Sequence, residues 1–278
     1  MTDHALALKA TVLRRRLLQL IHHAGAGHTG GGLSCLDILS ILYNRVLKIT
    51  PESVADPLRD RYVQSKGHCV EALYVVLSDR GYFPDADLDT VCRYRSPYVG
   101  HPTRKIRGIE MNTGALGHGL PICLGMALAA KRDRALHRVF TLLGDGELAE
   151  GSNWEAAMAA SHHQLDNLVA ILDHNTLQIT GHTRDVMSNE PLADKWLAFG
   201  WEVRSIDGHD YSALTHALTV PPAPGRPLVI IANTVKGKGV SFMENVGKWH
   251  HGVPSAAELA QALSELEATE ARLREGNP

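Results

Sequence analysis

The stretch VFTLLGDG, residues 139–146, sets the frame for the rest of this chain. Its first five residues form an unbroken apolar run, which predicts a parallel β-strand buried on both faces. The Gly-Asp-Gly that follows ends the strand and leaves Asp145 at its carboxyl end. A second apolar run, residues 168–172, comes one predicted helix later, as two neighbouring strands of a parallel sheet require.

Apolar runs and helical stretches continue to alternate on both sides of this pair. The order predicts a parallel sheet, and we assign an α/β fold class: a doubly wound, mostly parallel sheet with helices on both faces. We expect one α/β unit over residues 1–254 and a C-terminal helical tail over 255–278. Further strands are predicted at 61–64, 201–206 and 228–232, and helices over 4–24, up to Val46, up to Gly81, over 120–134, from Ser152 to about Gln164, and over 211–219.

Two local signals predict where helices begin. Residues Gly25–Gly32 are rich in glycine and predict a loop, with Ser34 as the N-cap of the next helix. Ser152 and Glu155 form an S-x-x-E capping-box pattern, which predicts a helix start at that point.

The composition excludes several classes of function. The 278 residues hold 28 Lys and Arg against 30 Asp and Glu, a net charge of −2, which gives no basic surface for nucleic acid. The apolar stretch Leu17–Ile21 is too short for a membrane span or a signal sequence. Four scattered cysteines form no C-x-x-C pair, so neither a zinc ribbon nor a disulfide framework is expected. We expect a cytoplasmic protein with free thiols and with no membrane or nucleic-acid partner.

Polar residues follow both central strands at their carboxyl ends, where ligands bind in doubly wound sheets. Asp145 follows the first strand and Asn175 the second, so we expect both side chains at one rim. A carboxylate, an amide oxygen and a backbone carbonyl, for which Leu177 is placed, suit a magnesium ion that completes its octahedron with water and phosphate. Gly146 lets the backbone approach a diphosphate closely, and the next helix N-terminus adds a favourable dipole.

Together with the capped helix and Leu172–Leu177, the Gly-Asp-Gly turn resembles the thiamine diphosphate motif. Further motifs follow in an order that resembles the N-terminal, diphosphate-binding half of transketolase over roughly residues 10–255. A lone histidine is more often a surface or core residue than a ligand, but three in glycine-containing loops, in family order, favour function. The motifs are Gly27-His28, Ser65-Lys66-Gly67-His68, Gly100-His101-Pro102, Thr113-Gly114-Ala115-Leu116-Gly117, the Gly-Asp-Gly block and Val235-Lys236-Gly237-Lys238-Gly239.

The resemblance implies two cofactors, thiamine diphosphate and Mg²⁺. It places Asp145, Asn175 and the Leu177 carbonyl on the metal. The implied cofactor-binding residues are His68, Gly114, Leu116, Asp145, Gly146, Glu147, Asn175, Lys236 and His250.

The resemblance also implies catalytic roles for four residues. His28 and His101 would face the donor ketose and shuttle protons or hold its hydroxyl groups, work that suits a side chain titrating near neutral pH. Glu150 resembles the acid that couples the two cofactor sites of a dimer. His250 matches a position that reaches the diphosphate and the substrate, and His251 is its rival in the doublet.

The chain departs from the family pattern in several places. Thr29 stands where the family usually has proline, and His118 replaces a common glutamine. The sequence also ends where a complete transketolase would continue into its pyrimidine-binding domain, which carries the glutamate that activates the cofactor. We therefore expect one subunit of a split enzyme, with a second subunit supplying the pyrimidine-binding and C-terminal domains, in an assembly with two copies of each chain (α2β2).

The expected reaction is transfer of a two-carbon ketol unit from a ketose, or ketose phosphate, to an aldose. Three alternatives remain at this point: a subunit resembling deoxyxylulose phosphate synthase, the α-subunit of a 2-oxoacid dehydrogenase, and a non-catalytic structural subunit. The donor and acceptor sugars, the pathway and the identity of the partner chain stay open.

Overall fold

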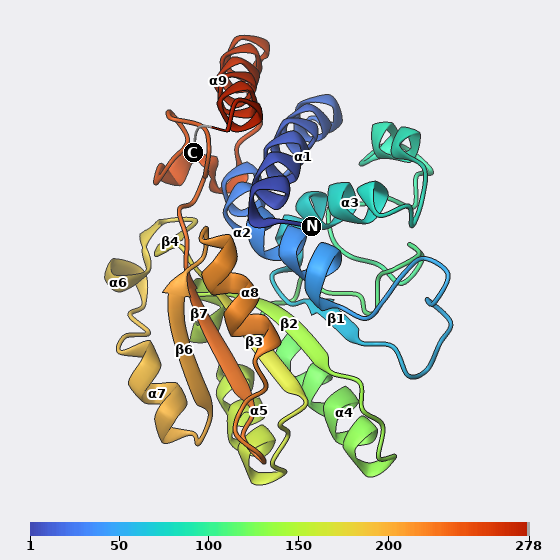
Figure 1. Ribbon diagram of the computed structural model, residues 1–278. Coiled ribbons are helices and arrows are strands. Elements are labelled where there is room, and N and C mark those ends of the chain that lie inside the picture. Colours follow the sequence, from blue (N-terminus) through green and yellow to red (C-terminus); the bar gives the residue numbers. More distant parts are fainter. Residues whose placement is uncertain (277–278) are drawn as a thin grey trace.

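The computed structural model describes residues 1–276, and its centre is a five-stranded sheet in which every neighbouring pair is parallel (Figure 1). The strand order is β1-β2-β3-β7-β6, so the last two strands enter the sheet in reversed order. The predicted α/β class is confirmed. The strands are β1 (Arg61–Gln64), β2 (Val139–Gly144), β3 (Leu168–His174), β6 (Glu202–Asp207) and β7 (Leu228–Asn233).

Alternate residues of the central strands enter two separate cores, one on each face of the sheet. Phe140 and Leu142 of β2 pack into the core formed with α1, α2, α3, α8 and α9, whereas Val139 and Leu143 pack into the core formed with α4, α5 and α7. A strand buried on both faces has no polar side to mark it, which explains its continuous apolar sequence. The helices are α1 (Asp3–Ala24), α2 (Thr29–Ile41), α3 (Val70–Asp79), α4 (Gly119–Arg132), α5 (Gly151–His162), α6 (Thr183–Val186), α7 (Leu192–Ala198), α8 (Tyr211–Thr219) and α9 (Ala256–Arg274).

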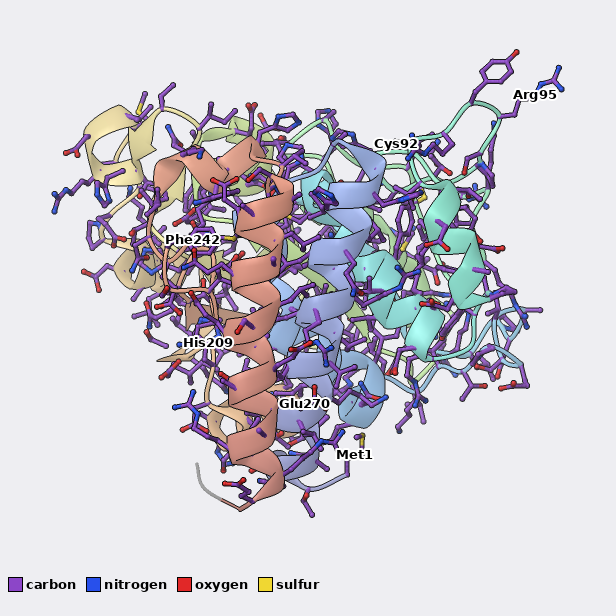
Figure 2. All side chains as sticks on the ribbon, turned by 90° about the horizontal axis from the view of Figure 1, so that it is seen from above. Met1, Cys92, Arg95, His209, Phe242 and Glu270 are labelled. Atoms are coloured by element: carbon purple, nitrogen blue, oxygen red, sulfur yellow. The ribbon has the colours of Figure 1, made fainter. Side chains whose placement is uncertain are left out.

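Helices α1 and α9 lie side by side along the outside of the first core (Figure 2). Helix α9 begins at a complete capping box between Ser255 and Glu258, and its Leu266 is buried. Arg15 of α1 reaches Glu267 and Glu270 of α9 at 2.8 Å each. The last two residues of the predicted tail, 277–278, lie outside the described residues.

A buried polar network ties α1, α2 and α8 to the segment after β7. Asp37 accepts hydrogen bonds from Arg14 at 2.5 Å, from the Tyr211 hydroxyl at 2.5 Å and from Nδ1 of His209 at 2.7 Å. The other ring nitrogen of His209, Nε2, accepts the backbone N–H of Val235 at 2.9 Å. The network therefore fixes the chain immediately before Lys236.

Two of the predicted helix starts are wrong. The glycine-rich loop is shorter than expected, because α2 begins at Thr29 with His28 as its N-cap, and Ser34 lies inside the helix. The Ser34 hydroxyl bonds to Gly31 O and to the Asp173 carboxylate instead of capping. Helix α5 begins at Gly151, and Ser152 donates to Gly117 O rather than forming a capping box.

The sequence did not predict the short elements between the strands. A two-stranded antiparallel hairpin, β4 (Leu177–Gln178) and β5 (Gly181–His182), follows β3. The others are a π-helical turn, η1 (Leu42–Val46), and the 3-10 turns η2 (Gly67–Cys69), η3 (Asp85–Thr90), η4 (Gly146–Ala149) and η5 (Gly247–His251). Within residues 1–276, no helix is both long and apolar enough to cross a bilayer.

Candidate functional site

A cavity of about 420 Å³ opens at the carboxyl ends of β2 and β3, beside the β4–β5 hairpin. Eleven of the thirteen predicted site residues line it. The structure thus brings together residues from seven separate parts of the chain. The lining residues are His28, Lys66, His68, Gly114, Leu116, Gly144, Asp145, Gly146, Glu147, Asn175, Leu177, Gln178, Ile179, Thr180, Lys236 and His250.

Asp145 is a buried carboxylate without a cationic partner among the described residues. Its Oδ1 accepts the Gly146 N–H at 2.7 Å, and its Oδ2 accepts the Thr176 N–H at 2.5 Å. Burial raises the pKa of Asp145, and the nearby Asp173 charge raises it further, against these two hydrogen bonds. A cation beside Asp145 would relieve both effects, so the carboxylate is suited to a metal ion.

The other two expected metal ligands also lie at this rim, and both carry hydrogen bonds. The Asn175 side-chain oxygen accepts the Leu177 N–H at 3.2 Å. The Leu177 carbonyl accepts Nζ of Lys236 at 2.9 Å. The donor set is carboxylate, amide and carbonyl oxygen, the type that magnesium prefers. Among residues 1–276, no cluster of three or more His, Cys, Asp or Glu side chains is placed to hold a metal ion.

Lys236 enters the cavity from the segment after β7 and contacts two of its walls. Besides Leu177 O, its Nζ lies 2.8 Å from Nδ1 of His250. Burial lowers the pKa of Lys236 to about 8, and the charge on Lys66 lowers it as well. Burial and Lys236 together lower the pKa of His250 to about 3, so His250 is neutral at pH 7. At pH 7 the cavity is therefore lined by the cationic side chain of Lys236 and by the neutral imidazole of His250.

Four imidazoles gather around that of His28. Its ring centroid lies 5.1 Å from that of His68, 6.4 Å from His101, 5.7 Å from His250 and 4.6 Å from His251. Burial lowers the pKa of His28 to about 4 and also lowers the pKa of His101. Both rings are therefore neutral at pH 7. A neutral imidazole can accept a proton at one ring nitrogen and donate a hydrogen bond from the other.

The structure distinguishes the two histidines of the 250–251 doublet. His250 lines the cavity and stacks on His68 at 5.6 Å with an interplanar angle of 19°. His251 is exposed, does not line the cavity and meets His28 edge to face.

Two of the expected catalytic residues do not line the cavity. His101 lies behind Gly114, where a Cβ would come within 2.5 Å of the imidazole Cδ2. Glu150 is exposed and is the N-cap residue of α5, beside Gly117. Glu147, in contrast to Glu150, is buried. Its carboxylate binds the Ser65 hydroxyl and accepts the N–H groups of Gly117 and Gly144 at 3.0 Å each.

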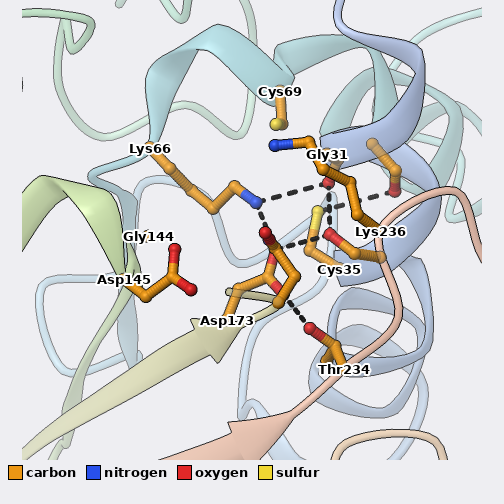
Figure 3. Close-up of polar contacts among 12 residues, drawn as sticks. Gly31, Cys35, Lys66, Cys69, Gly144, Asp145, Asp173, Thr234 and Lys236 are labelled. Atoms are coloured by element: carbon orange, nitrogen blue, oxygen red, sulfur yellow. Dashed lines mark hydrogen bonds and ion pairs between the residues drawn. The ribbon is translucent and has the colours of Figure 1, made fainter. Parts of the chain in front are cut away.

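A buried ion pair at the wall of the cavity was not predicted from the sequence. Lys66 pairs with Asp173, which also accepts hydrogen bonds from Ser34 at 2.6 Å and from Thr234 (Figure 3). Lys66 Nζ further donates to Gly31 O at 3.3 Å. Both residues stand in motifs that were quoted above, but nothing in the sequence shows that they meet. The hairpin residues Gln178, Ile179 and Thr180 also line the cavity without having been predicted.

These features define a class of protein, an α/β fold with a polar cavity at the carboxyl edge of its parallel sheet. A family model described as the thiamine diphosphate binding domain of transketolase matches residues 7–269. This chain belongs to the transketolase family.

The chain matches relatives of about its own length and others about twice as long. It is 45% identical to an apulose-4-phosphate transketolase subunit of Phocaeicola vulgatus, over 100% of this chain and 99% of that protein. It is 44% identical to a 6-deoxy-6-sulfo-D-fructose transketolase subunit of a Clostridium species, over 93% of this chain and 95% of that protein. The crystal structure of Campylobacter jejuni transketolase superposes with a TM-score of 0.86 and 31% identity, and the match covers 99% of this chain but 48% of that one. The chain thus spans about half of a long transketolase.

Proposed function

We propose that this chain is the thiamine diphosphate-binding subunit of a two-chain transketolase, which moves a two-carbon ketol unit from a ketose to an aldose. The observation that carries the proposal is a single cavity holding a buried carboxylate–amide pair, a buried lysine and a cluster of histidines. The near full-length match to proteins that are themselves named as single subunits of a transketolase supports the two-chain form.

Asp145, Asn175 and the Leu177 carbonyl are the proposed ligands of Mg²⁺, with the remaining positions left to phosphate and water. Gly146, Lys236, His68 and His250 line the cavity and would hold the diphosphate. Gly146 is packed closely, since a Cβ there would lie 2.7 Å from Oε1 of Gln178. Lys236 donates to Leu177 O in the structure, so metal binding and the Lys236 contact must share that carbonyl. Gly114 and Leu116, which also line the cavity, would contact a ring of the cofactor. When bound, thiamine diphosphate supplies the electron sink for cleavage of the donor carbon–carbon bond.

In the proposal, the histidines transfer protons and bind hydroxyl groups of the donor ketose. His28, neutral at pH 7, accepts a proton from a donor hydroxyl group or holds that group by a hydrogen bond. His101 supports the same region from behind Gly114 and contacts the substrate only where the donor reaches past that glycine. His250 orients the diphosphate through its free ring N–H.

In the proposal, a partner subunit supplies the other parts of the enzyme. It carries the pyrimidine-binding and C-terminal domains, and two copies of each chain form the assembly (α2β2). Glu150, exposed here, couples two cofactor sites across that interface. Ile179 of the cavity wall, with 73% of its surface exposed, packs on the partner. Residues 1–254 act as the cofactor-binding unit, with 255–278 as its helical tail, and the protein works in the cytoplasm.

The names of the relatives suggest the donor class. One acts on a sugar phosphate and another on a sulfonated sugar, so we propose a ketose with a terminal anionic group as donor. The test combines the purified chain with its proposed partner, thiamine diphosphate, Mg²⁺ and a panel of phosphorylated and sulfonated ketoses. Ketol transfer by the mixture and none by either chain alone supports the proposal. Full turnover by this chain alone, or none by the mixture despite cofactor binding, contradicts it.

A further inference from the structure

Glu71 is a buried acid for which the proposed mechanism has no use. It is the second residue of α3, and only 1% of its surface is exposed. It forms no ion pair with any residue that the structure describes, and its Oε2 finds no hydrogen-bond partner among them. A buried polar atom left without a partner has a free-energy cost and requires an explanation.

The carboxyl group of Glu71 faces the backbone that carries His28. Gly27 has a φ of +151°, and a Cβ at this position would lie 3.1 Å from Glu71 Oε1 and 2.8 Å from Ile21 Cγ1. The chain at Gly27 therefore rests directly on the acid, with no room for a side chain. A displacement of the carboxyl group would therefore act on the backbone at Gly27, the residue before His28.

The same face of α3 supports the other histidine of the donor end. Tyr74 lies three residues after Glu71, which places the two side chains next to each other on the helix. Its hydroxyl donates to Val99 O at 2.9 Å and lies 3.5 Å from His101 O. One buried polar face of α3 thus contacts both the backbone that precedes His28 and the backbone at His101.

The surroundings of Glu71 favour its neutral form. Burial raises its pKa to about 8, and the nearby Cys69 raises it further, while the backbone N–H groups of Glu71 and His28 oppose the shift. The titratable groups that face it are His28 from the α1–α2 connection, Cys69 before α3, Tyr74 of α3 and Cys92 after η3. None of these groups is a cation at pH 7.

We propose that Glu71 is a positioning residue that, as a neutral carboxylic acid, holds Gly27 and His28 in place beneath the donor ketose. Ionisation of Glu71 in mildly alkaline solution places an unpaired negative charge beside Gly27 and displaces His28. The reaction is therefore slower at high pH. This inference rests on the proposed ketol transfer at the same cavity.

The test compares the wild-type chain with Glu71→Gln and Glu71→Leu, each assembled with the partner subunit. The amide of Glu71→Gln has the size of the acid and can still hydrogen bond, but it cannot ionise. Turnover, KM for the donor and affinity for thiamine diphosphate are measured from about pH 6 to pH 10. Ser78→Ala, one turn beyond Tyr74 on α3, is the matched control, because Ser78 is buried on the same helix and its hydroxyl has no hydrogen-bond partner among the described residues.

In the wild type, kcat/KM for the donor falls about tenfold by pH 9, as expected for a group with a pKa of about 8. At saturating thiamine diphosphate, Glu71→Gln retains its activity at pH 7 within about threefold and loses most of this alkaline decline. Its cofactor affinity, which depends on Lys236, matches that of the wild type at each pH. Glu71→Leu loses turnover at pH 7 because no polar group supports the Gly27 backbone. Ser78→Ala keeps the wild-type profile.

An alkaline decline of the same size in Glu71→Gln overturns the proposal, as does an equal loss of cofactor affinity. If Glu71→Gln does not fold, infrared difference spectra of the wild type decide instead. They should show a protonated carboxyl band at pH 7 that disappears above pH 8, and its absence overturns the assignment. Ketol transfer by the wild type at pH 7 tests the proposed function separately, so the two failures are distinguishable.

Discussion

The ammonium group of Lys236 lies 2.8 Å from Nδ1 of His250, so the two side chains fix each other in the cavity. An ammonium group has no lone pair and can only donate, which makes Nδ1 the acceptor. The ring proton of neutral His250 must then reside on Nε2, where it can be donated to an anion. A lysine contact thus turns an imidazole that could exist as either tautomer into a defined hydrogen-bond donor.

We predict that Lys236→Met releases this constraint. Nitrogen-15 spectra of the wild type should show His250 as the Nε2–H tautomer, and spectra of the variant should show a mixture. Affinity for thiamine diphosphate should fall by about tenfold or more, since a hydrogen bond to a charged group contributes about 1.5–3 kcal/mol. Lys238→Met, a more exposed lysine two residues away, is the control. A pure Nε2–H signal in Lys236→Met would contradict the interpretation.

Asp145→Ala should abolish magnesium-dependent binding of thiamine diphosphate. The variant removes the charged member of the proposed ligand set, and even residues behind metal ligands contribute about 10–100-fold to metal affinity. We therefore expect a loss of more than about 100-fold, measured by titration calorimetry on the assembled protein. Asp133→Ala removes an exposed carboxylate at the end of α4 and should bind normally. Unchanged affinity in Asp145→Ala means that the metal lies elsewhere.

His28→Ala and His101→Ala should separate chemistry from cofactor binding. Loss of a residue that transfers protons lowers the rate by about 10²–10⁴-fold. We expect such a decrease for His28→Ala and a smaller one for His101→Ala, whose ring lies behind Gly114. Cofactor affinity should change little in either variant. His163→Ala, outside the cavity, serves as the control, and wild-type transfer in both variants would make these histidines structural.

The Lys66–Asp173 pair should be more sensitive to loss of one partner than of both. Lys66→Met leaves a fully buried carboxylate unpaired, which destabilises a protein by about 3–5 kcal/mol. The double variant Lys66→Met with Asp173→Leu should recover part of that loss. Urea unfolding of both single variants and the double variant measures the coupling free energy. Additive losses would show that the pair has no coupling.

Stability should fall in acid because of Asp37. Arg14 and His209 hold the pKa of this buried carboxylate well below its usual range, against the effect of burial. A carboxylate with a lowered folded-state pKa stabilises the protein above its usual value of 3.8, and this contribution is lost as the pH falls toward the folded-state pKa.

The corresponding variant is Asp37→Asn, which should lower the free energy of unfolding by about 3 kcal/mol at pH 7. The difference from the wild type should narrow below about pH 4, and urea unfolding at several pH values measures it. Asp79→Asn breaks a partly exposed pair with Lys9 and should cost less than about 1 kcal/mol. A difference that is independent of pH would contradict the role of Asp37.

The strands could be predicted from the sequence because each central strand is buried on both faces and therefore reads as one apolar run. Helix starts were harder, since a serine near a helix N-terminus has other partners available. Ser34 bonds to Asp173, and Ser152 bonds to Gly117 O, so neither caps its helix.

The residues of the site also differ in whether the sequence alone could predict them. Asp145 and Asn175 could be placed because strand ends in a parallel sheet meet at one edge. Lys66 and Asp173 could not be paired, because they are 107 residues apart and only the folded chain brings them together. The β4–β5 hairpin has two residues per strand, too few to show an alternating pattern.

The packing of α9 on α1 has a consequence for how the protein is made. The segment that carries Lys236 lies close to both helices, since a Cβ at Gly239 would lie 3.2 Å from Arg14 Cδ and 3.4 Å from Leu266 Cδ2. Contacts between residues so far apart in sequence slow folding. During translation, the contacts around Gly239 can be completed only after Leu266 has left the ribosome. A nascent chain stalled before that point exposes apolar residues of α1, and it is then a target for chaperones and for aggregation.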